Sequence, residues 1–173
     1  MFLNLDTIPH FYKNYVKLIE ASDVSVALRL SGYRMLETIH GIPEKDADFA
    51  YGPDKWTIRE LLCHVIDAER IFAYRALRFA RQDRTPLAPF NENAYAPLAN
   101  ASNRSLRKIG DELQHLRTST LDLFESFTPD MMNAKGIVGE NELAVAALGY
   151  IIAGHETHHR KILVERYLTA LSK

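Results

Sequence analysis

The sequence predicts an all-α fold, a four-helix bundle, from two observations. Four long segments carry apolar residues at helical spacing, and no segment carries a convincing strand alternation. Amphipathic helices without a sheet bury their apolar faces against one another, which is the architecture of a bundle. A chain of 173 residues is long enough for one sizeable core and too short for two. We therefore expect a single domain over residues 1–173.

The first helix is expected from about Asp23 to His40. Gly41 and Pro43 follow it in the order that ends a helix, because glycine tolerates the turn and proline cannot continue the helical hydrogen bonds. The segment before Asp23 is rich in aromatic residues. We expect it to form a short helix or an ordered arm that covers one end of the bundle.

The second helix has the clearest start. Thr57-Ile58-Arg59-Glu60 is a capping box, in which the threonine and glutamate side chains satisfy two free backbone N–H groups. Trp56 precedes the box and can pack on Leu61 as a hydrophobic staple, although a place in a substrate wall stays open. The apolar stripe of this helix continues to about Ala80.

The third helix should run from near Asn103 to near Ser126, and the fourth from about Glu142 to Ala170. Between them, Thr128-Pro129-Asp130 has the form of the cap and first turn of a short extra helix, because proline is favoured at the first helical position.

The connection between the second and third helices, residues 81–102, is longer than two neighbouring helices need. Loops of this length are usually covers, interfaces or linkers, and Phe90 and Tyr95 argue against a disordered linker. We expect the part from Phe90 to Tyr95 to form a pocket wall. With the arginines and aromatics of residues 74–83, YRALRFARQD, the loop also suggests a surface for a symmetric homodimer; an ordinary charged helix end is the alternative.

The fourth helix carries the most informative motif, His155-Glu156-Thr157-His158-His159. His155 and His159 lie one turn apart at the centre of the apolar stripe, whereas His158 falls toward its edge and is the weaker candidate. A buried imidazole needs partners for both ring nitrogens, and one metal ion can satisfy two such histidines together. Two hydrogen-bonded core histidines are the alternative.

A metal site needs a third ligand from another helix. His64 sits close to the edge of the apolar stripe of the second helix, so a modest rotation of that helix would aim it at the interior. His64, His155 and His159 would leave a coordination position for water or substrate, as catalytic sites do. The other histidines lie in the amino-terminal arm, at a helix end and on the expected solvent side of the third helix: His10, His40 and His115.

Two stretches of the sequence resemble the DinB-like (YfiT-like) family of metal-binding four-helix bundles. They are YGPDKWTIRELLCHVIDAERIFAYRALRFARQD (residues 51–83) and GYIIAGHETHHRKILVERYL (residues 149–168), and the resemblance extends more loosely over nearly the whole chain, including PLAPFNENAY. It implies a divalent metal bound by a histidine of the tryptophan-led helix and an H-x-x-x-H pair in the last helix. Those positions are His64, His155 and His159 here, and three imidazoles suit zinc, nickel or iron.

The same motif matches H-E-x-x-H of zinc metalloproteases. Those enzymes need a third ligand downstream, and the 14 residues after His159 contain no histidine. A strand that could bind an extended peptide is also missing from the predicted elements. We therefore do not expect a protease.

Two carboxylates are weak candidates for a general base. Glu156 lies about 100° round its helix from the neighbouring histidine, and is otherwise a solvated carboxylate or one that orients a ligand. Asp67 follows the histidine of the second helix by three residues, and is otherwise an exposed helix carboxylate. Glu69 falls near the centre of the apolar stripe, so it needs a partner such as Arg75, Arg78 or a group across an interface.

Charge and composition limit the partners. The net charge is -1 and no lysine or arginine cluster exceeds a dipeptide, so we expect no nucleic-acid partner. No apolar run is long enough to span a bilayer. The only cysteine, Cys63, cannot form an internal disulfide, and the amino terminus has no signal-peptide pattern. These features are typical of a cytoplasmic protein.

We expect a metal-dependent enzyme that acts on a small molecule. A three-histidine centre can lower the pKa of bound water or hold a thiolate as nucleophile. The resemblance implies transfer or isomerisation that uses a low-molecular-weight thiol, or metal-dependent hydrolysis; we place S-transfer first and hydrolysis second. The alternative is a non-catalytic, metal-binding stress or damage-response protein that dimerises. A pocket at the metal would favour the enzyme, and a sealed site the alternative.

Overall fold

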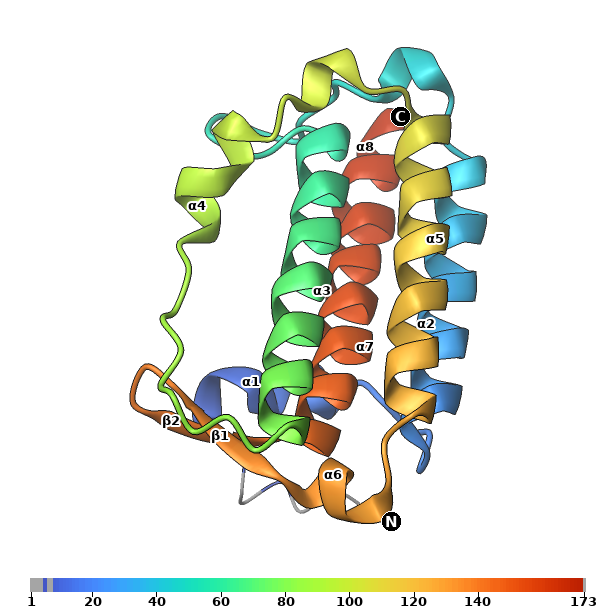
Figure 1. The fold of residues 1–173 in the computed structure, drawn as a ribbon. Coiled ribbons are helices and arrows are strands. Elements are labelled where there is room, and N and C mark those ends of the chain that lie inside the picture. Colours follow the sequence, from blue (N-terminus) through green and yellow to red (C-terminus); the bar gives the residue numbers. More distant parts are fainter. Residues whose placement is uncertain (1–4, 6–7, 173) are drawn as a thin grey trace.

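Four long helices form a bundle, which confirms the predicted fold class (Figure 1). The computed structural model describes residue 5 and residues 8–172 of the chain. The long helices are α2 (Val24–His40), α3 (Ile58–Ala80), α5 (Leu106–Glu125) and α7 (Val145–Ile162). The last helix continues through a π-helical segment, Leu163–Leu168, into α8 (Thr169–Leu171). Within the described part of the chain, no helix is both long and apolar enough to cross a membrane.

The helix starts follow from local capping. Asp23 caps α2 by accepting a hydrogen bond from the backbone N–H of Val26. At α3 the predicted capping box is formed, because Thr57 Oγ1 accepts from the N–H of Glu60 and the Glu60 carboxylate accepts from the N–H of Thr57. The third helix is capped by Ser105 and so begins slightly later than predicted.

The long connection exists because α3 and α5 run in the same direction, so the chain must return along the length of the bundle between them (Figure 1). The return carries α4 (Glu92–Tyr95) and two short 3₁₀ turns (Ala96–Leu98 and Ala101–Asn103). Both α2 and α3 pack mainly against α5 and α7, so the consecutive helices α2 and α3 lie across the bundle from each other. The two helices that carry the candidate ligands, α3 with His64 and α7 with His155 and His159, are therefore direct neighbours.

One expectation was wrong: a β-hairpin precedes the last helix. Strands β1 (Lys135–Val138) and β2 (Asn141–Ala144) pair antiparallel, so Glu142 is in a strand and α7 begins at Val145. The sequence signal for this hairpin is the glycine in its turn, because Gly139 adopts a positive φ of 59° that favours glycine. Strands this short carry too few alternating positions to stand out from a helical pattern.

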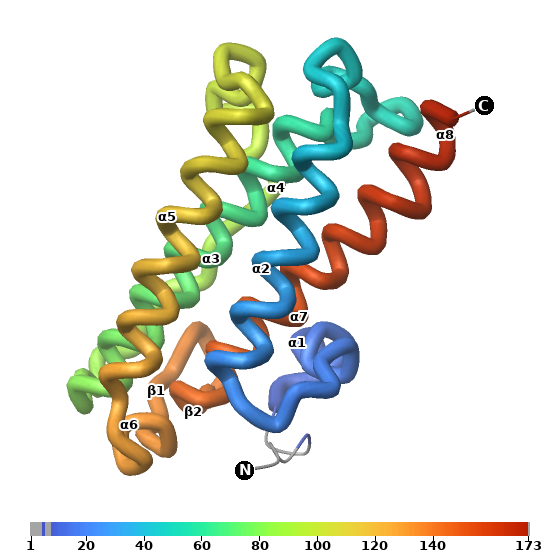
Figure 2. Tube along the Cα trace, turned by 90° about the vertical axis from the view of Figure 1, so that its right-hand side faces the viewer, coloured from blue at the N-terminus to red at the C-terminus, as the bar shows by residue number. Residues whose placement is uncertain are grey.

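The predicted amino-terminal arm contains the short helix α1 (His10–Val16), which packs on α7 at one end of the bundle (Figure 2). Its close approach needs Gly154, because a Cβ at that position would collide with the backbone carbonyl of Tyr15. The rest of the arm, residues 1–4 and 6–7, lies outside the described residues. The short extra helix near Pro129 is α6 (Pro129–Asn133), capped by Thr128 as predicted.

The core consists of two apolar clusters at opposite ends of the bundle. The cluster beside α1 and the hairpin includes Leu28, Phe79, Leu148 and Ile151. The other includes Met35, Leu61, Ile109 and Leu113. Buried polar side chains from all four long helices lie between the two clusters: Ser31, Glu69, Arg117 and Glu156.

Arg117 is the centre of this polar layer. Its Nε and Nη2 donate to the two carboxylate oxygens of Glu69 at 3.0 and 2.8 Å, and Nη1 donates to Ser31 Oγ at 3.0 Å. Glu69 therefore has the partner that its burial requires, but the partner is Arg117 on α5 rather than the expected Arg75 or Arg78.

Candidate metal centre

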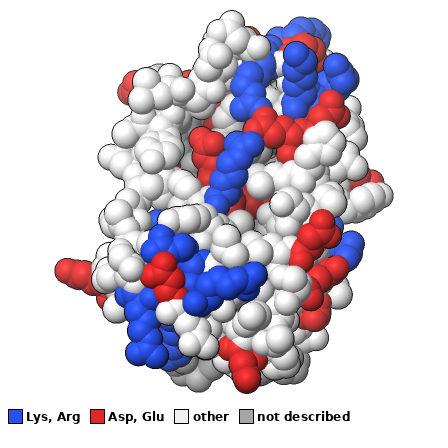
Figure 3. Space-filling model, viewed as in Figure 1, with Lys and Arg blue, Asp and Glu red and all other residues white. Residues whose placement is uncertain are grey.

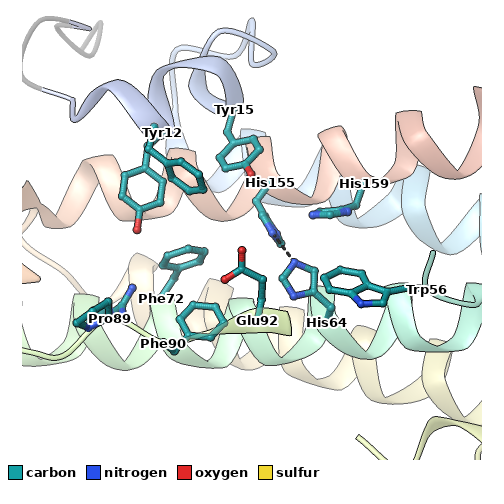
Figure 4. A pocket seen from close by; sticks show the side chains of 12 residues that line it. Tyr12, Tyr15, Trp56, His64, Phe72, Pro89, Phe90, Glu92, His155 and His159 are labelled. Atoms are coloured by element: carbon teal, nitrogen blue, oxygen red, sulfur yellow. Dashed lines mark hydrogen bonds between the residues drawn. The ribbon is translucent and has the colours of Figure 1, made fainter. Parts of the chain in front are cut away.

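Three histidine side chains converge between α3 and α7. His64 comes from α3, and His155 and His159 come from successive turns of α7 (Figure 4). One ring nitrogen of each lies within 4.8 Å of the others, and the Nε2 atoms of His64 and His155 are 3.0 Å apart. The three side chains are only 7, 6 and 9% exposed. The structure therefore brings together the three histidines that the sequence singled out.

The protonation of these rings suits a metal. Burial lowers the pKa of His64 to about 4 and that of His159 to about 3, and holds the pKa of His155 well below 6.5. At neutral pH all three are neutral imidazoles, which is the form that binds metal. Nδ1 of His159 is buried without a hydrogen-bond partner in the described part of the chain. Neutral nitrogens that face one another fit a shared divalent cation.

His158 lies outside this cluster. It is half-buried, and its ring packs edge-on against Tyr15 at 5.1 Å between centroids. The other histidines, His10, His40 and His115, are exposed at the surface.

A pocket of about 290 Å³ opens beside the three histidines. Trp56 forms the wall next to His64, with 4.8 Å between ring centroids. Apart from the histidines, the lining residues come from α1, the segment just before α3, α3 itself and the long connection: Phe11, Tyr12, Tyr15, Trp56, Phe72, Arg75, Pro89, Phe90 and Glu92. Phe90 lines the pocket as the sequence predicted. Tyr95 does not line it; its exposed ring lies 5.6 Å from that of Phe90 between centroids.

The two carboxylates singled out from the sequence do not line this pocket. Glu156 is buried in the polar layer, where its Oε2 lies 2.9 Å from Nη2 of Arg117. Asp67 is partly exposed and pairs with Arg70 on the next turn at 3.7 Å. Neither is placed to exchange a proton with a molecule beside the histidines.

Glu92 is the carboxylate that sequence reasoning missed. Among the described residues it is the only Asp or Glu that lines the pocket, and its side chain extends into the space between Phe72 and His64 (Figure 4). Burial lowers the pKa of His64, and the negative charge of Glu92 raises it in part. A local signal was available, because Asn91 caps α4 by accepting from the N–H groups of Asn93 and Ala94, which sets Glu92 at the first position of that helix.

The family model of the DinB superfamily matches residues 27–163, which include both histidine-bearing helices. The chain belongs to the DinB superfamily. No curated protein matches its sequence.

Solved structures agree with this membership. YfiT from Bacillus subtilis, "a probable metal-dependent hydrolase with an unusual four-helix bundle topology", superposes with a TM-score of 0.76 at 14% identity over 98% of this chain and 93% of YfiT. A mycothiol-dependent maleylpyruvate isomerase superposes with a TM-score of 0.67 at 10% identity over 92% of this chain, and a histidine-to-alanine mutant of that isomerase with 0.64. The chain spans 62% of the length of the isomerase. At these identities the likeness shows the DinB-like fold.

Proposed function

We propose that this DinB-superfamily protein is a metal-dependent enzyme. It holds one divalent ion, zinc, nickel or iron, through His64, His155 and His159, and it acts on a small molecule in the adjoining pocket. The observation that carries the proposal is the convergence of three neutral imidazoles at the wall of that pocket. A divalent ion bound there supplies a Lewis acid that activates water or a thiol.

The chemistry we propose first is S-transfer with a low-molecular-weight thiol, and hydrolysis second. Support comes from the two kinds of structural neighbour, one a probable metal-dependent hydrolase and the other a thiol-dependent isomerase. Glu92 is the proposed proton acceptor, because among the described residues it is the only carboxylate that lines the same pocket as the histidines. Trp56, Tyr15 and Phe90 form aromatic walls that limit access of water to the reacting groups.

The alternative is a non-catalytic, metal-binding protein of a stress or damage response. Such a protein has no need of a small-molecule cavity at its metal, and a site sealed by side chains would favour it. The pocket of about 290 Å³ beside His64 and His155 favours the enzyme.

We also propose a cytoplasmic homodimer. Tyr74 and Leu77 expose apolar surface on the outer side of α3, near the start of the long connection. On the face seen in Figure 3, basic and acidic side chains lie beside one another, so this face has no extended field of one sign. Light scattering at tens of micromolar tests the dimer, and a monomer alone would contradict it.

The enzyme is tested by metal analysis of protein purified without added metal, followed by a screen of low-molecular-weight thiols with electrophilic substrates. We expect about one divalent ion per chain and turnover that stops on chelation. One ion per chain with no thiol-dependent or hydrolytic turnover would favour the non-catalytic alternative.

A further inference from the structure

Arg75 is a buried cation that has no carboxylate partner within the described part of the chain. It is 3% exposed, and no Asp or Glu of the described residues lies within 4.0 Å of its guanidinium. Arg117, buried to a similar degree, has two carboxylates against it. An arginine removed from water without an anion is costly, so buried arginines are normally paired as Arg117 is.

The contacts of Arg75 hold it in place without neutralising its charge. Its guanidinium carbon lies 5.6 Å from the ring centre of Phe72 and 5.7 Å from that of Phe90. Nη2 donates to the backbone carbonyl of Ala88 at 3.0 Å, and the hydroxyl of Tyr12 lies nearby. These groups offer π faces and neutral oxygens, which orient a guanidinium but leave its positive charge available to a ligand.

Arg75 also faces the same pocket as the histidines. It follows His64 by eleven residues on α3, about three helical turns, so both side chains leave the helix on one face. The two positions are on the order of 16 Å apart along the helix axis. Phe72 lies between them, with its ring 6.1 Å from that of His155. The pocket thus has a cationic end, an aromatic middle and a histidine end.

The charge of the pocket selects the kind of anion. Arg75 is the only Lys or Arg that lines the pocket in the described part of the chain, and Glu92 lines it too. A phosphate dianion would meet one cation and one carboxylate, whereas phosphate sites gather several donors or cations. A carboxylate carries a single charge and matches the planar fork of one guanidinium.

We propose that Arg75 binds the carboxylate of a small-molecule substrate whose apolar part packs against Phe72 and Phe90. The placement of the reacting group at the histidines rests on the proposed function, whereas the carboxylate site itself does not. The expected substrate is therefore a monocarboxylate with an apolar or aromatic segment.

The test uses metal-free protein, so that a carboxylate cannot bind to a metal instead. Trp56 is the only tryptophan and lines the pocket, so its fluorescence reports occupancy, and calorimetry measures affinity. The probes are 3-phenylpropionate, its neutral amide and phenyl phosphate. We expect the acid to bind about tenfold more tightly than the amide, and more tightly than the phosphate.

Arg75→Met should remove the preference for the acid over the amide. Arg78→Met is the matched control: Arg78 is on the same helix and also lies over a ring, 5.5 Å from that of Tyr74, but it pairs with Asp83 and does not line the pocket. It should keep the preference. Circular dichroism and thermal melting check that both variants fold.

Equal affinity of wild type for acid and amide would overturn the proposal, as would an Arg75→Met protein that keeps the preference. Tighter binding of phenyl phosphate would overturn the assignment of a carboxylate. If Arg75→Met does not fold, the wild-type comparison decides, because no other Lys or Arg among the described residues lines the pocket. A wild type that prefers the acid but shows no metal-dependent turnover would leave this site standing and remove the proposed function.

Discussion

The guanidinium of Arg117 on α5 lies 2.9 Å from the carboxylate of Glu156 on α7, one residue from His155. Burial raises the pKa of Glu156, and the charge of Arg117 opposes that effect. The same guanidinium binds Glu69 on α3, so a single cation ties together the two helices that carry the histidines. The polar layer thus links α3 and α7, the two helices of the histidine cluster, and Glu156 is part of that layer.

Arg117→Met should destabilise the protein by about 3–5 kcal/mol, because it leaves two carboxylates buried without a cation. Urea unfolding measures the change. Arg107→Met is the control, since Arg107 forms an exposed pair with Asp111 one turn away, and its loss should cost less than about 1 kcal/mol. Equal effects of the two substitutions would show that the buried layer contributes no more than a surface pair.

Removal of a proposed ligand should abolish metal binding. His155→Ala or His159→Ala takes one nitrogen from the cluster, and metal retention and metal-dependent turnover should both be lost. His158→Ala is the control and should change neither, because its ring lies outside the cluster. Metal per chain is measured for the three variants side by side. Equal metal content in wild type and His159→Ala would contradict the site and favour hydrogen-bonded core histidines.

The bundle should fold without metal. The two apolar clusters on either side of the polar layer bury enough surface to stabilise the helices, so metal adds stability only by mass action. Circular dichroism after exhaustive chelation should retain the helical signal, with a lower melting temperature. Loss of most of the helical signal would mean that the metal is structural, as in a zinc finger.

Acid should destabilise the metal-free protein. The folded pKa of His64 is lowered to about 4 and that of His159 to about 3, while the unfolded chain keeps values of about 6.5. Below pH 6.5 the unfolded chain binds more protons than the folded protein does. The free energy of unfolding that is present above pH 6.5 is therefore lost progressively as the pH falls toward 4 and 3. Urea unfolding between about pH 7.5 and 5 measures the slope.

His64→Leu should flatten that slope, because it removes one of the buried groups that must stay neutral. His115→Ala, at an exposed position, should leave it unchanged. Metal affinity should also decrease as the pH is lowered, because protons compete with the metal for the ring nitrogens. Since the pKa values of His64 and His159 are lowered in the folded protein, this competition is strongest below pH 6.5. A stability independent of pH across this range would contradict the buried, neutral state of the histidines.

Glu92→Gln should lower turnover by about 100-fold or more while metal content stays at the wild-type level, because the residue is proposed as proton acceptor and not as ligand. Asp67→Asn is the matched control on α3 and should keep its activity, since Asp67 does not line the pocket. Loss of metal in Glu92→Gln would instead assign Glu92 to the coordination of the ion.

Several parts of the fold could be predicted because their causes are local. The capping box at Thr57 and the end of α2 before Pro43 depend on neighbouring residues alone. The partner of Glu69 could not be predicted in this way, since Arg117 is 48 residues away in the sequence. A clue was present in the sequence: Arg117 falls four residues after Leu113 and four before Leu121, on the apolar stripe of α5.

The sequence by itself determined the four long helices, their apolar faces and the three candidate histidines, because helical periodicity states which side chains share a face. Tertiary structure alone decided what meets those faces. The parallel course of α3 and α5 sends the long connection back over the histidines, and this brings Glu92 and Phe90 into their pocket. The order of helices around the bundle gives Arg117 two carboxylates and leaves Arg75 with none from the residues that the structure describes. Contacts between distant segments depend on helix order and direction, which no local pattern encodes.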